Sequence, residues 1–122
     1  MKSSIIASVL VAAAALPAGC ERQELVGPPD IRLARDQCAE CGMIISDERF
    51  SCALLVARDS RREHIIFDDI GCMLDFEQRH LDGAAVIDRF TREYVAKEWV
   101  PASAATFLAC DARIVPTPMG SG

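Results

Sequence analysis

One pattern constrains the fold of this chain most strongly. Two short apolar runs flank a charged turn, and an acidic cap and a helix follow them. Residues 51–58 form a continuous apolar run whose length and composition suit a buried strand. Residues 63–69 predict a second strand that pairs back across the polar turn as a hairpin. Asp69 is expected to cap a helix over residues 70–80, in which Ile70, Met73, Leu74 and Leu81 recur at helical spacing. Residues 84–90 predict a third strand.

This order of elements predicts an α+β fold built from a strand-strand-helix-strand unit. We expect Trp99 and residues 104–109 to belong to the core and to include another strand. We also expect core positions for the thiols of Cys52 and Cys110, because both residues lie in apolar runs. Residues 37–104 would form the first unit. Residues 105–122 would begin a second, incomplete unit.

The N-terminus has the layout of a secretory signal. Lys2 precedes an alanine-rich apolar run over residues 5–16, which is shorter than the roughly 20 residues that a membrane span needs. Small residues then lead to Cys20, as in the lipobox of bacterial lipoproteins, although Pro17 stands where leucine is usual. We therefore expect a signal peptide over residues 1–19, lipidation of Cys20 and a tether over residues 20–36. A lipoprotein of this kind would lie on the periplasmic face of a bacterial membrane, inner or outer.

Charge and cysteine number restrict the class of function. The net charge of −5, with no basic patch, argues against a nucleic-acid partner. If Cys20 is lipidated, the remaining five of the six cysteines cannot all pair within one chain. At least one thiol is then free, bound to metal or joined to a partner.

The motif with the clearest chemistry is Cys38-Ala39-Glu40-Cys41-Gly42-Met43. Cysteines three residues apart can direct both sulfurs at one centre, and Met43 adds a thioether. Soft donors of this kind select copper(I), whereas zinc takes four donors without methionine. A disulfide or a redox pair remains an alternative, although a thioredoxin-like site would open a helix after a strand, and here a hairpin follows.

Residues elsewhere in the chain could complete such a site. Met119, between Pro118 and Gly120, serves no apolar face and is a candidate third ligand. Cys72 and His64 are second-rank ligand candidates together with Cys38. Met73 belongs to the apolar stripe, and helix capping explains Asp69 of the Asp68-Asp69 pair more simply than acid–base chemistry does.

Several motifs in the same order resemble the NosL family of accessory lipoproteins of nitrous oxide reductase. These motifs are Cys-Gly-Met-Ile at 41–44, Phe-Asp-Asp-Ile-Gly-Cys-Met at 67–73, Trp99 before an alanine-rich stretch, and Thr-Pro-Met-Gly-Ser-Gly at 117–122. The resemblance implies copper(I) bound by Cys41, Met43 and Met119. It also implies two related strand-strand-helix-strand units, similar to part of the organomercurial lyase fold.

The resemblance further implies a role and partners. The protein would be a chaperone rather than an enzyme, and would pass copper(I) to an ABC-transporter-type complex that builds the copper centre of nitrous oxide reductase. Relatives often have histidine where this chain has Ala39, and they continue past the residues corresponding to 117–122. The rival functions are a thiol–disulfide oxidoreductase using Cys38 and Cys41 and a structural zinc module.

Overall fold

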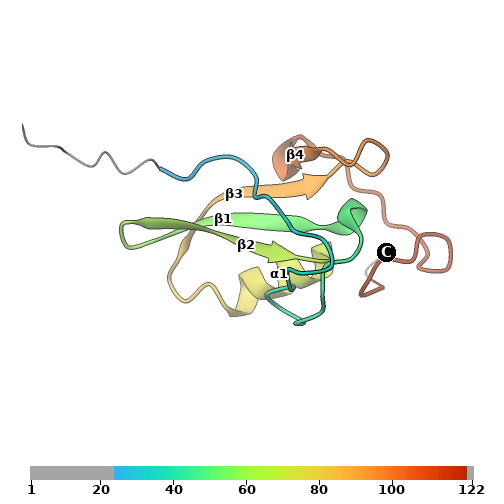
Figure 1. The fold of residues 1–122 in the computed structure, drawn as a ribbon, viewed down its shortest axis with the longest axis horizontal. Coiled ribbons are helices and arrows are strands. Elements are labelled where there is room, and N and C mark those ends of the chain that lie inside the picture. The colour runs from blue at the N-terminus through green and yellow to red at the C-terminus, as the bar shows by residue number, and fades with distance from the viewer. Residues whose placement is uncertain (1–23, 121–122) are drawn as a thin grey trace, which may run out of the picture.

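The part of the chain that the structure describes is built around one antiparallel sheet with one α-helix against it (Figure 1). The structure is a computed structural model that describes residues 24–120, so the expected signal peptide and Cys20 lie outside the described residues. The principal elements are β1 (Cys52–Arg58), β2 (Arg61–Phe67), α1 (Ile70–Arg79), β3 (Ala85–Arg92) and β4 (Trp99–Pro101). The strand order in the sheet is β2-β1-β3-β4. The chain order β1-β2-α1-β3 confirms the predicted α+β class and the strand-strand-helix-strand unit.

The hairpin and the helix form where local sequence chemistry places them. The β1–β2 turn places Asp59 at φ 55°, a conformation that short polar residues in hairpin turns tolerate. Asp69 caps α1 as predicted, since its side chain accepts a 2.6 Å hydrogen bond from the Gly71 amide. The link between β2 and α1 is therefore only two residues long, Asp68 and Asp69.

The core lies between the sheet and α1. Strand β1 is central, and its first five residues are all buried. On the helix side, Leu54 and Val56 pack with Phe67 of β2 and Met73 of α1 in one apolar cluster. Met73 is 2% exposed, which confirms its predicted place in the core.

A segment before β1 lies along the sheet (Figure 1). Arg62 of β2 donates to the Leu25 carbonyl, and His64 Nε2 lies 2.7 Å from the Gly27 carbonyl oxygen. Ile31 and Ile45 are buried. Residues 24–36, the described part of the expected tether, thus contact the domain. Within the described part of the chain, no helix is long and apolar enough to cross a membrane.

The sequence prediction for residues 104–110 is wrong in part. A further strand is present, but it is β4, and it is only three residues long. A single 3₁₀ turn over Ala102–Ala104 follows, and Phe107, Leu108 and Cys110 are exposed rather than buried. The apolar run does not enter the core because β4 is an edge strand with no further strand beside it in the described sheet.

Candidate metal centre

The loop that carries Cys38 and Cys41 has a fixed backbone. Gln37 and Ile44 form an isolated antiparallel bridge, and the Cys38 amide donates to the Met43 carbonyl at 2.8 Å. The Gly42 amide donates to the Cys38 carbonyl at 3.0 Å, and Gly42 has a φ of +74°. Glycine suits this position because side-chain-bearing residues rarely adopt positive φ. The tight turn brings both cysteines to the same side of the loop.

Contacts with two elements fasten this loop to the rest of the domain. The Ala39 amide donates to the Ile66 carbonyl of β2 at 2.9 Å. The Glu40 carboxylate pairs with Arg79 Nη2 at 2.6 Å, and its other oxygen lies 3.5 Å from His80 Nε2. The loop is therefore held against β2 on one side and against the end of α1 on the other.

Two residues from the β2–α1 junction complete the group. Asp68 lies in the two-residue link, and Cys72 lies in the first turn of α1. The Cys41 sulfur is 3.5 Å and 3.6 Å from the two Asp68 carboxylate oxygens. Asp69 caps α1 and so fixes where the helix begins. The positions of Asp68, just before the cap, and Cys72, in the first turn, follow from that start.

Cys38, Cys41, Asp68 and Cys72 form a cluster, here called the thiol cluster, in which one ligand atom from each residue lies within 4.8 Å of all the others. Cys38 and Asp68 are each 2% exposed and Cys72 is 4% exposed, whereas Cys41 is half-buried. The thiol cluster therefore opens to solvent at Cys41. Three sulfurs and one carboxylate at this spacing make a potential metal-binding site.

Burial disfavours the thiolate form of the two inner thiols and so raises the pKa of each. Burial raises the pKa of Cys38, although backbone N–H groups of Cys41, Asp68 and Glu40 act in the opposite direction on its sulfur. Burial, followed by the neighbouring Cys38 and Cys41, raises the pKa of Cys72 far above its usual range. A metal ion that binds here must therefore displace thiol protons.

The structure places the other sequence-predicted ligands around or away from the thiol cluster. The Met43 side chain is 44% exposed, on the same loop as Cys41. Met119 is 49% exposed, and its amide donates to the Asp69 carboxylate at 3.2 Å, which ties the C-terminal segment to the residue beside Asp68. His64 instead contacts the Gly27 carbonyl and is not a member of the thiol cluster.

Cys52 and Cys110 differ in their surroundings. Cys52 is fully buried in β1, as predicted, and its pKa is raised well above its usual value, first by burial and then by the charge of Asp69. Cys110 was expected in the core but is exposed. Neither belongs to the thiol cluster.

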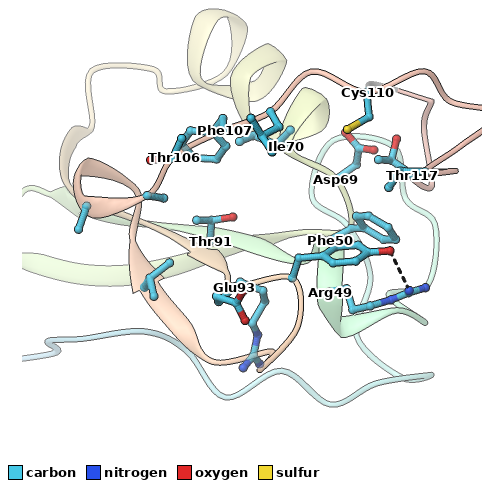
Figure 2. A pocket seen from close by; sticks show the side chains of 17 residues that line it. Arg49, Phe50, Asp69, Ile70, Thr91, Glu93, Thr106, Phe107, Cys110 and Thr117 are labelled. Atoms are coloured by element: carbon cyan, nitrogen blue, oxygen red, sulfur yellow. Dashed lines mark hydrogen bonds between the residues drawn. The ribbon is translucent and has the colours of Figure 1, made fainter.

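A separate pocket of about 540 Å³ lies between β3 and the segment after β4. Figure 2 shows Cys110 near Asp69 and Thr117 on one side of this pocket, with Phe107 and Ile70 also lining it. Arg49 also lines the pocket and donates to the Tyr94 hydroxyl at 3.3 Å. No residue of the thiol cluster lines this pocket.

Asp68 is the member of the thiol cluster that the sequence prediction missed. The two adjacent acids suggested a helix cap, and Asp69 alone fills that role. The available signal was the spacing Asp68-x-x-x-Cys72, which places a carboxylate immediately before a helix that carries a cysteine in its first turn.

Comparisons with known proteins do not assign the chain to a family. No family model, no curated protein and no solved structure matched it.

Proposed function

We propose that this protein is a copper(I) chaperone: a lipid-anchored protein on the periplasmic face of a bacterial membrane that delivers copper(I) for assembly of the copper centre of nitrous oxide reductase. The observation that carries the proposal is the meeting of three thiols at an opening lined by Cys41. Thiolates are soft donors, and soft donors favour soft ions such as copper(I). The recipient would be the reductase or its ABC-transporter-type maturation complex.

The arrangement of the donors suits delivery as well as binding. Two sulfurs are buried and one is half-buried, so an incoming ligand would reach the ion from the Cys41 side. Met43 and Met119 are exposed residues, and their thioethers are neutral and therefore weaker donors than thiolates. We propose that Cys38, Cys41 and Cys72 hold the ion, and that Met43 and Met119 bind it while it enters or leaves.

The chemistry of Cys38 weighs against the oxidoreductase alternative. Redox-active cysteines have lowered pKa values and an accessible sulfur, often at a helix N-terminus. Cys38 is buried, its pKa is raised, and the Cys38–Cys41 segment is a loop. We therefore propose a non-catalytic role for the pair.

The proposal is tested by competition for copper(I) between the reduced protein and a chromophoric copper(I) chelator. We expect one copper(I) per chain, held tightly enough to take the ion from the chelator. A protein that left copper(I) with the chelator, yet reduced a disulfide substrate without metal, would be an oxidoreductase instead.

A further inference from the structure

Asp68 stands out because a buried carboxylate usually has a cationic partner. Asp68 is 2% exposed, and within residues 24–120 no lysine, arginine or histidine pairs with it. Its carboxylate instead faces the Cys41 sulfur at 3.5 Å and 3.6 Å, and it also contacts Cys38. A thiol is a weak hydrogen-bond donor, so it compensates poorly for the loss of water around a carboxylate.

A cation in the thiol cluster would provide the missing compensation. The carboxylate lies within 4.8 Å of all three sulfurs, so one ion could touch the four side chains at once. Backbone N–H groups of Cys41, Asp68 and Glu40 lie close to the Cys38 sulfur, where they can donate hydrogen bonds to it once a metal has replaced its proton. The loop is also fixed in advance by the Glu40–Arg79 ion pair.

The number and type of donors distinguish between ions. Copper(I) prefers sulfur and gains little from a hard carboxylate oxygen. Zinc takes four donors in a tetrahedron and accepts cysteine sulfur together with aspartate oxygen. Three sulfur donors are enough for copper(I). The fourth donor of the cluster, the anionic carboxylate oxygen, is the one that a four-coordinate divalent ion requires.

We infer that the thiol cluster is also a site for a divalent ion of the zinc class, bound by Cys38, Cys41, Cys72 and Asp68, and that Asp68 determines the preference between this ion and copper(I). The two ions use the same three sulfurs, so they exclude each other. This inference shares the site of the proposed function but does not require that copper be delivered anywhere.

The test compares Asp68→Asn with the unmutated protein, in the reduced state, for zinc and for copper(I) separately. Asn keeps the shape of the side chain but removes its charge. We expect the zinc affinity to fall by about 10- to 100-fold or more, because loss of even an outer partner of a metal ligand costs that much. The copper(I) affinity should stay within about threefold, because copper(I) favours the sulfur donors.

The control is Asp88→Asn, an exposed aspartate on β3 outside the thiol cluster, which should change neither affinity. Cobalt(II) bound to the unmutated protein gives a second readout that does not depend on the folding of a variant. For a four-coordinate site we expect an absorption spectrum with intense visible bands and, in addition, thiolate-to-metal charge-transfer bands. Weak visible bands, as six-coordinate cobalt(II) gives, would overturn the inference.

The outcomes separate this inference from the proposed function. Zinc binding that Asp68→Asn leaves unchanged, or equal losses for both metals, would overturn the inference and leave copper(I) delivery standing. Tight zinc binding that depends on Asp68, in a protein that fails to compete for copper(I), would support the inference and sink the proposed function.

Discussion

Cys52 is the most completely enclosed thiol of the described chain, and it lies beside the charges of Asp68 and Asp69. Its raised pKa means that the folded protein keeps the Cys52 proton at pH values where an unfolded chain, with an ordinary thiol pKa near 9.0, releases it. Proton loss from the unfolded state favours unfolding. The stability contribution is thus complete below about pH 9 and is lost as the pH rises further.

We therefore predict that the free energy of unfolding of the reduced, metal-free protein falls above about pH 9, by up to about 1.4 kcal/mol per pH unit for each buried thiol. Denaturant unfolding at a series of pH values measures this slope. Cys52→Ala should make the slope shallower whatever its effect on absolute stability. An unchanged slope in Cys52→Ala would show that this thiol does not stay protonated in the folded state.

Met119 is a second residue whose role can be isolated. Its side chain is half exposed, so truncation removes little packing, while its amide is tied to Asp69. We predict that Met119→Ala lowers copper(I) affinity by about tenfold, or about 1.4 kcal/mol, with an unchanged melting temperature. Chelator competition and a thermal melt measure the two quantities. Affinity equal to that of the unmutated protein would make the segment around Met119 purely structural.

At the scale of elements, α1 contributes to both the core and the thiol cluster through adjacent residues. Neighbouring helical side chains point about 100° apart, so Met73 packs in the core while Cys72 joins the cluster. We predict that Met73→Ala destabilises the protein by roughly 2–5 kcal/mol, as expected for a buried methionine. Copper(I) affinity, measured below the unfolding transition, should be unchanged. A large loss of affinity in a folded Met73→Ala protein would mean that the residue supports the site.

Elements that carry a clear local signal were predictable from the sequence. The β1–β2 hairpin and α1 follow from apolar patterning, a polar turn and the Asp69 cap, each a local signal. Residues 104–109 were misassigned because apolarity alone does not say whether a partner strand is available. Burial at that position depends on the edge of the sheet, which is a property of the tertiary fold.

The candidate site was predictable only in part for a related reason. Cys38 and Cys41 were found by their spacing, but the approach of Cys72 and Asp68 depends on how the loop lies against β2 and α1. That arrangement rests on contacts such as Ala39 to Ile66 and Glu40 to Arg79, which join residues 27 and 39 positions apart. Neither pair forms a recognisable sequence pattern.

At the scale of the whole molecule, the proposed anchor would hold the thiol cluster near a membrane-bound recipient. A multiply acylated Cys20 would exceed the two signals that stable anchoring needs. We predict that the protein partitions with membranes and that Cys20→Ser releases it or blocks its processing. Fractionation and mass analysis of the N-terminus measure this. An unmodified N-terminus in a protein found wholly in the periplasmic fraction would contradict the anchor.

The central claim is that the thiol cluster, and no other cysteine of residues 24–120, binds copper(I). The most direct measurement is the copper(I) affinity of the reduced Cys41→Ser protein, compared with the unmutated protein and with Cys110→Ser as the matched control. Cys41 is the half-buried donor at the opening, and Cys110 is an exposed thiol outside the cluster. We predict that Cys41→Ser loses more than about tenfold in affinity, while Cys110→Ser binds like the unmutated protein. Equal copper(I) affinity in the two variants would contradict the account.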